Sequence, residues 1–132
     1  MRVRIALLGL LIWTGAASVQ AATYTVYADG SGQFPNIQAA LNYASPGDII
    51  QLGDGIYVGT GNRNLDFGSM GTTKDLTLRS ISNNPQACVI DCQGRMQGHP
   101  IAERAFYFHT AETNASLIQG IRIYDGLGTG TL

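Results

Sequence analysis

Short runs of hydrophobic and β-branched residues recur along most of the chain, and each run predicts a β-strand. The first run, residues 23–27, is closed by the turn-forming residues 29–32. From residue 48 onward the runs are separated by Gly, Asn and Asp, which predicts strands at 48–52, 56–58, 64–67, 76–80, 89–92, 106–108 and 117–124. The pattern therefore favours a fold made mainly of short strands.

One segment follows a helical spacing instead. Apolar residues recur there at i, i+3, i+4 and i+7, namely at Ile37, Ala40, Leu41 and Ala44. Asn36 stands directly before them as an N-cap, and Pro46 and Gly47 end the segment. A helix of about two turns is not stable alone, so we expect it to pack against the strands.

The spacing of the strands favours a β-solenoid over a β-sandwich. The runs group roughly in threes, near residues 49, 56 and 65, then 76, 89 and 106, then from 118 onward. Two-residue hairpin turns are scarce, because Asp54-Gly55 is the one clear case before Asp125-Gly126. A stack of coils with three short strands each would produce this rhythm, since every coil buries its apolar face against the next.

The first 21 residues have the organisation of a cleavable export signal. Arg2 and Arg4 precede an apolar stretch at 5–13, and small residues follow up to Ala21, after which we predict cleavage. The apolar stretch is about half the ~20 residues needed to span a bilayer, so no membrane span is expected after cleavage. The sequence thus predicts a signal peptide at 1–21 and a secreted or cell-surface protein, extracellular or periplasmic.

Composition narrows the classes of partner. The chain has 132 residues, enough for one domain, and is 45% hydrophobic and only 13% charged, which argues against disorder. Its formal net charge of −1 provides neither the basic surface that nucleic acids require nor a polybasic membrane patch. We therefore expect no binding to nucleic acids.

Three stretches near the amino terminus carry a family resemblance. Residues 29–41 are Asp-Gly-Ser-Gly-Gln-Phe-Pro-Asn-Ile-Gln-Ala-Ala-Leu, residues 46–52 are Pro-Gly-Asp-Ile-Ile-Gln-Leu, and residues 55–57 are Gly-Ile-Tyr. In this order they resemble the amino-terminal region of pectinesterases and, more broadly, secreted proteins of the pectin lyase-like superfamily. The resemblance implies an all-β fold, a right-handed parallel β-helix (solenoid) with an amino-terminal capping strand and short helix. Residues 22–132 would be the amino-terminal part of that domain, truncated at its carboxyl end.

The same resemblance implies a function on acidic, pectin-like polysaccharide or a cell-surface glycan. Pectinesterases typically continue G-x-Y-x-E, whereas Gly59 stands here in place of the glutamate, and their later catalytic segments have no counterpart before Leu132. We therefore assign no catalytic residue, although a longer form would be a polysaccharide lyase or a pectinesterase-like enzyme. The alternative is a non-enzymatic surface structural or adhesin solenoid.

Polar and aromatic residues on the outward positions of the later strands are candidate glycan-binding groups. With a period of two, one side of each strand points away from the core. Guanidinium groups bind carboxylates and aromatic rings pack on sugar faces, which makes a stripe of such residues suitable for an anionic polysaccharide. The candidates are Arg79, Tyr107, His109, Arg122 and Tyr124. The alternative is an ordinary solvated face.

The sequence implies no cofactor, although one group of residues could bind calcium. Asn62, Asn64 and Asp66 alternate with larger residues, so on a strand their side-chain oxygens would share one face. The superfamily resemblance adds that pectate lyases use calcium to bridge acidic sugars. Solvated turn residues or an asparagine ladder are the alternatives.

Two cysteines stand four residues apart in a chain predicted to be exported. On a continuous strand, Cys88 and Cys92 would lie about 13 Å apart, beyond the ~7 Å limit for a disulfide, so a bond requires a turn between them. Two small thiols packed in the interior are the alternative. A zinc site that adds His99 and His109 would need the unusual spacing C-x3-C-x6-H-x9-H.

Overall fold

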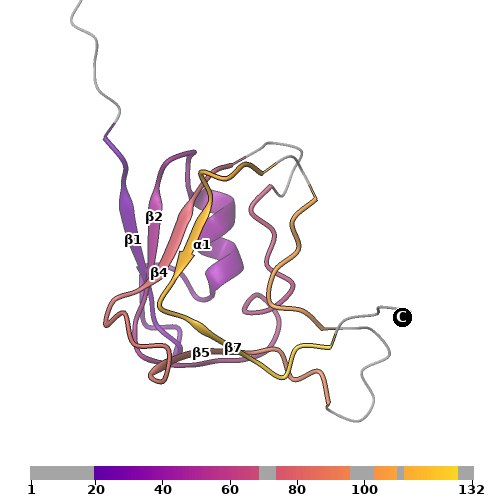
Figure 1. The fold of residues 1–132 in the computed structure, drawn as a ribbon. Helices are drawn as coiled ribbons and strands as arrows, with labels where there is room; N and C mark the ends of the chain where they lie inside the picture. Colours follow the sequence, from indigo (N-terminus) through magenta and orange to yellow (C-terminus); the bar gives the residue numbers. More distant parts are fainter. Residues whose placement is uncertain (1–19, 69–73, 96–102, 110–111, 128–132) are drawn as a thin grey trace, which may run out of the picture.

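The computed structural model describes residues 20–68, 74–95, 103–109 and 112–127, which form two parallel β-sheets and one short helix (Figure 1). The four-stranded sheet has the order β1 (Thr23–Val26), β2 (Ile49–Leu52), β4 (Thr77–Ser80) and β6 (Leu117–Gln119). The three-stranded sheet has the order β3 (Gly55–Tyr57), β5 (Cys88–Asp91) and β7 (Arg122–Tyr124). Helix α1 spans Ile37–Tyr43.

The chain alternates between the two sheets. It passes from β2 to β3, from β4 to β5 and from β6 to β7, so each sheet gains one parallel strand at every pass. In Figure 1 the four-stranded sheet stands upright, and β5 and β7 cross below it. Residues of equal register therefore form rows across each sheet, such as Gln51, Arg79 and Gln119 in the larger one.

The predicted fold class is wrong. The seven strands and one helix make a mixed arrangement of two small parallel sheets, and the described residues do not close into the all-β right-handed parallel β-helix that we expected. Residues 64–67 and 106–108 were predicted to be strands of a third side, but their backbone pairing is limited to the isolated bridge Leu65–Phe106. Asn64 has a φ of 52°, a left-handed conformation that interrupts an extended strand.

Most individual elements follow the predicted pattern. The strand near the amino terminus and the helix are confirmed, and Asn36 is the N-cap, with its side-chain oxygen accepting from the Ala39 amide at 2.9 Å. The run at 117–124 differs, because Gly120 has a φ of 68° and turns the chain between β6 and β7. One predicted strand thus contributes to both sheets.

The core lies between the inward faces of the two sheets and α1. The largest fully buried side chains from strands and helix are Tyr57, Ile37, Leu41, Ile50, Leu52, Leu78 and Ile90. Burial raises the pKa of Tyr57, whose hydroxyl donates to the backbone oxygens of Val26 and Gly53, each at 2.9 Å. As expected from its short length, α1 packs against the strands, since its apolar face belongs to the same buried cluster.

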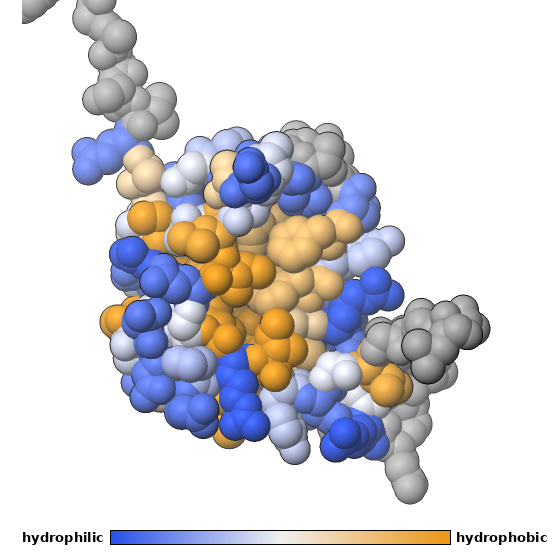
Figure 2. All heavy atoms as spheres, viewed as in Figure 1, coloured by the Kyte–Doolittle hydropathy of each residue, from blue (hydrophilic) through white to orange (hydrophobic). Residues whose placement is uncertain are grey.

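The two ends of the stacked strands differ. At β1, the Thr25 amide donates to the Gln33 side chain at 2.7 Å, the Thr25 carbonyl accepts from the Gln33 amide at 3.0 Å, and Phe34 forms a bridge with Val26. At the other end, β6 and β7 are the last strands of their sheets. Leu117 of β6 and Ile123 of β7 are exposed there. Figure 2 shows hydrophobic residues gathered on the face that is turned to the viewer.

The predicted export signal lies outside the described residues, apart from residues 20 and 21. Within the described part of the chain, no helix has the length and apolar character needed to cross a membrane.

Candidate functional site

A groove crosses the outer face of the three-stranded sheet. It has a volume of about 340 Å³ and is lined by Gly55, Ile56, Gln86, Ala87, Val89, Asp91, Arg122 and Tyr124. The strands position these side chains by alternation: Cys88 and Ile90 of β5 are buried in the core, which leaves Val89 and Asp91 on the outer face. Register then places Arg122 beside Val89, and Tyr124 beside Asp91.

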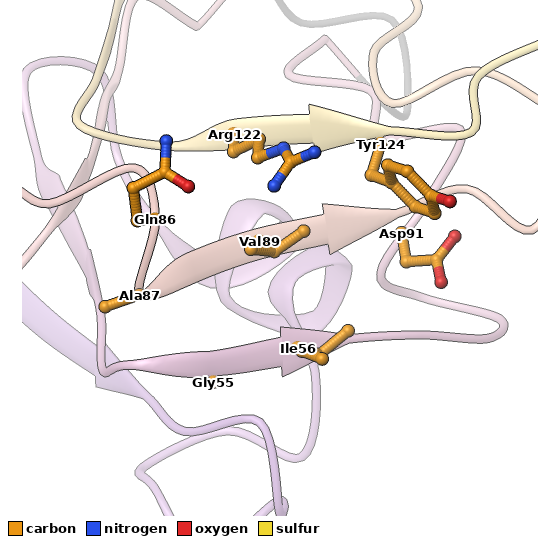
Figure 3. Close-up of a pocket in the computed structure, with 8 residues that line it drawn as sticks. All are labelled: Gly55, Ile56, Gln86, Ala87, Val89, Asp91, Arg122 and Tyr124. Carbon is orange, nitrogen blue, oxygen red and sulfur yellow. The ribbon is translucent and has the colours of Figure 1, made fainter.

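Arg122 and Tyr124 form one charged and aromatic surface in this groove. Both residues are exposed, and the guanidinium carbon of Arg122 lies 5.4 Å from the centre of the Tyr124 ring, a cation–π arrangement. Figure 3 shows both side chains projecting from β7 next to Val89 and Asp91. The groove therefore combines a cation, an aromatic face and a carboxylate over an aliphatic floor.

The other predicted arginine, Arg79, lies on the four-stranded sheet. Arg79 is the centre of the row Gln51, Arg79 and Gln119, and with the Gln51 amide oxygen turned towards it, its Nη2 donates at 2.7 Å and its Nε at 3.2 Å. The groove around it has a volume of about 320 Å³ and is lined by Gln51, Arg79, Ser80, Ile81, Asn83 and Gln119. Arg79 and Arg122 therefore do not share a surface.

Tyr107 and His109 lie at a third place, on the segment that contacts residues 64–66. His109 Nε2 is 3.0 Å from the Asp66 carboxylate, and the Tyr107 and His109 rings contact each other at a tilt of 31°, with 4.2 Å between their centres. Arg104 covers the Tyr107 ring at 4.8 Å. The predicted stripe of five residues is thus divided among three surfaces, because β4 and β7 belong to different sheets and the segment at 106–108 joins neither of them.

The predicted calcium ligands have internal hydrogen-bond partners. Asn62 accepts from the Ile37 amide and donates to the Val58 carbonyl, both at 3.0 Å, which ties it to the start of α1. Asn64 donates to Glu103 and accepts from the Arg104 amide, whereas Asp66 accepts from the Gly68 amide and contacts His109. Each of the three side chains thus bonds to a different part of the chain, and the expected alternation on one strand face is missing because Asn64 is not in a strand.

The two cysteines are free and buried. Cys88 points into the core from β5, Cys92 follows just after the strand, and burial raises the pKa of both thiols. The interior packing that we considered as the alternative to a disulfide is what the structure has. Of the zinc candidates, His99 lies outside the described residues, and the described residues contain no cluster of three His, Cys, Asp or Glu side chains able to hold a metal ion.

Sequence reasoning missed several residues of the groove. Ile56, Val89 and Asp91 form its floor and edge. The alternation of inward and outward positions, applied to the strand predicted at 89–92, would have placed Val89 and Asp91 on the outer face. Gln86 precedes β5 in a loop, and no periodic pattern marks such a position.

No protein-family model, curated protein or solved structure matches this chain.

Proposed function

We propose that this protein is an exported, non-catalytic binder of acidic polysaccharide and that it holds the glycan in the groove on β3, β5 and β7. The observation that carries this proposal is the pairing of Arg122 and Tyr124 in one groove with an aliphatic floor. The resemblance of residues 29–57 to pectinesterases supports an acidic, pectin-like glycan as the ligand class.

The chemistry of the groove suits a uronic-acid unit. The Arg122 guanidinium is planar and can donate two parallel hydrogen bonds to a carboxylate. The Tyr124 ring offers an apolar face against which the C–H groups of a sugar can pack. Asp91, opposite Tyr124 in the register, is an acceptor for sugar hydroxyls.

Calcium is not required by this proposal. Arg122 itself supplies the positive charge for a carboxylate, and the predicted calcium ligands Asn62, Asn64 and Asp66 are occupied by internal hydrogen bonds. Binding is therefore expected to be the same in EDTA and in millimolar calcium.

The test is calorimetric titration of the protein with oligogalacturonate and, in parallel, with a neutral malto-oligosaccharide. Oligogalacturonate is expected to bind and the neutral sugar is not. Arg122→Gln and Tyr124→Ala should each lower the affinity about tenfold, which corresponds to about 1.4 kcal/mol. Affinity should also fall with added salt, because the guanidinium–carboxylate contact is exposed.

Arg79→Gln is the matched control, since it removes one arginine from the outer face of the other sheet with the same change of charge. An equal loss for Arg79→Gln and Arg122→Gln would mean that net charge alone attracts the glycan, and would contradict the proposed groove. Absence of binding by the unaltered protein would contradict the function itself.

A second candidate is a structural or adhesin role at the cell surface. It is favoured by the apolar residues exposed at β6 and β7, which include Leu117 and Ile123 at 47% and 52% exposure. Adhesion of coated beads to cells whose acidic glycans have been removed enzymatically would distinguish this role from glycan binding.

A further inference from the structure

The carboxylate of Asp48 fixes the first residue of the fold. Asp48 is only 5% exposed, and its two oxygens accept from two different backbone amides: Oδ1 from Ala22 and Oδ2 from Ser45, both at 2.8 Å. Ala22 in turn accepts from the Ile49 amide at 2.8 Å, one step before Thr23 and Ile49 pair in the β1–β2 ladder. Among the described residues, Ala22 is thus the first with these backbone hydrogen bonds.

Backbone amides are the donors to the Asp48 carboxylate in the described part of the chain. The ion pairs found within the described part of the chain involve Arg63, Arg95 and His109, and none of them reaches Asp48. A nearly buried carboxylate held only by neutral amides is less stabilised than one with an opposite charge at hydrogen-bond distance. A positive charge at the Ala22 nitrogen would therefore stabilise the Asp48 carboxylate.

The sequence supplies a way to create that charge. Residues 20 and 21 are exposed, and the small residue Ala21 ends the segment that has the pattern of an export signal. According to this pattern, a peptidase would cut the Ala21–Ala22 peptide bond. The nitrogen of that bond is the one that donates to Asp48 Oδ1.

We propose that the Ala21–Ala22 peptide bond is a processing site and that its hydrolysis places a new amino-terminal ammonium on the Asp48 carboxylate. Water adds across the bond, leaving a carboxylate on Ala21 and an ammonium on Ala22. The Ala22 nitrogen keeps its place 2.8 Å from Asp48 Oδ1, so the donor to this carboxylate changes from a neutral amide to an ammonium, and the hydrogen bond becomes an ion pair. Removal of the signal peptide therefore releases the protein and also stabilises its fold. This role goes beyond glycan binding and does not involve the groove on β3, β5 and β7.

The first test compares two purified chains, one starting at Ala22 and one starting at Ala21, both released from a fusion that leaves no extra residue. The longer chain keeps a neutral amide at Ala22. The chain that starts at Ala22 is expected to have a melting temperature higher by about 4–8 °C at neutral pH, because the donor to the Asp48 carboxylate is then a cation instead of a neutral amide. Equal melting temperatures would overturn the proposal.

Two further chains assign the effect to Asp48. In Asp48→Asn the difference between the two starting points should disappear, and a difference that persists would overturn the proposal. If Asp48→Asn does not fold, the chain starting at Ala22 can be acetylated at its amino group, which removes the charge and leaves Asp48 in place. The acetylated chain is expected to melt like the chain that starts at Ala21.

The second test locates the cut. Amino-terminal sequencing of the exported protein is expected to give Ala-Thr-Tyr-Thr, the sequence at 22–25. Any other starting residue would overturn the assignment of the site. Glycan affinity should be the same for chains that start at Ala21 and at Ala22, so the result is independent of the proposed function.

Discussion

Gly120 lies directly against Asn83, and both residues have left-handed backbone conformations, with φ values of 68° and 52°. A Cβ atom at Gly120 would lie 2.6 Å from Asn83 Oδ1 and 2.9 Å from its Cα. This contact joins the turn between β6 and β7 to the loop that follows β4, so it controls how the chain passes from one sheet to the other.

Gly120→Ala should therefore be strongly destabilising. The side chain would add the strain of a positive φ to a clash with backbone, and we expect a loss of about 2–3 kcal/mol in the free energy of unfolding, measured by urea denaturation. Gly47→Ala is the matched control, because Gly47 has a φ of 89° but no atom within 4 Å of its added Cβ. It should cost only about 1 kcal/mol. Equal losses at both positions would show that the Asn83 contact is unimportant.

The Tyr57 hydroxyl should contribute to stability through its two hydrogen bonds. Tyr57→Phe leaves the buried carbonyl oxygens of Val26 and Gly53 without this donor, and we expect a loss of about 1–3 kcal/mol in thermal or urea unfolding. Tyr43→Phe, at a residue that is 66% exposed, should change the free energy of unfolding by less than about 0.5 kcal/mol. A similar effect of both changes would contradict the role assigned to the Tyr57 hydroxyl.

Removing one partner of the ion pair between Arg63 and Glu103 should lower the free energy of unfolding substantially. Arg63 Nε lies 3.2 Å from Glu103 Oε2, and the two side chains are 10% and 5% exposed. Glu103→Ala leaves a nearly buried guanidinium without its carboxylate, so we expect a loss of about 3 kcal/mol in urea unfolding.

Arg95→Ala tests the same kind of bond in solvent, because Arg95 pairs with Asp125 at 3.4 Å while 83% exposed. It should cost at most about 0.5 kcal/mol. If Glu103→Ala costs no more than Arg95→Ala, burial does not govern the strength of these pairs.

Asp75 should make stability dependent on pH in the acid range. Hydrogen bonds from the Thr113 amide and hydroxyl, with a further one from Ser116, lower the pKa of this carboxyl below its usual value of 3.8. Because the folded pKa is lower than the unfolded one, the contribution is complete above the unfolded pKa and is lost as pH falls through the folded pKa.

Asp75→Asn should therefore flatten the decline of stability below about pH 4, measured by thermal unfolding at pH values from 2 to 6. Unfolding curves with the same acid dependence in both proteins would contradict this assignment.

Local patterns in the sequence were sufficient for most elements. The helix was predictable because Asn36 and the apolar face at Ile37 and Leu41 act within a few residues of one another. Most strands were predictable because alternation is also local. The fold class was not, since it depends on whether the segments around Leu65 and Phe106 extend into a sheet, and the left-handed conformation of Asn64 prevents that.

The candidate site was predicted only in part for the same reason. Arg122 and Tyr124 lie two residues apart on β7, so alternation alone placed them on one face. Their partners Val89 and Asp91 come from β5, and only the register between distant strands brings them together. Arg79, Tyr107 and His109 were assigned to the same surface from alternation, which carries no information about which sheet a strand joins.

The difference between the two ends of the stacked strands limits how copies of this protein can associate. Gln33 and Phe34 occupy the edge at β1, whereas β6 and β7 are the outermost described strands at the other end. Fibres grow when every subunit offers two complementary edges, because each addition restores an edge for the next subunit. Among the described strands, β6 and β7 leave such an edge accessible, whereas Gln33 and Phe34 pair with part of β1, so edge-to-edge pairing is expected at β6 and β7 rather than at β1.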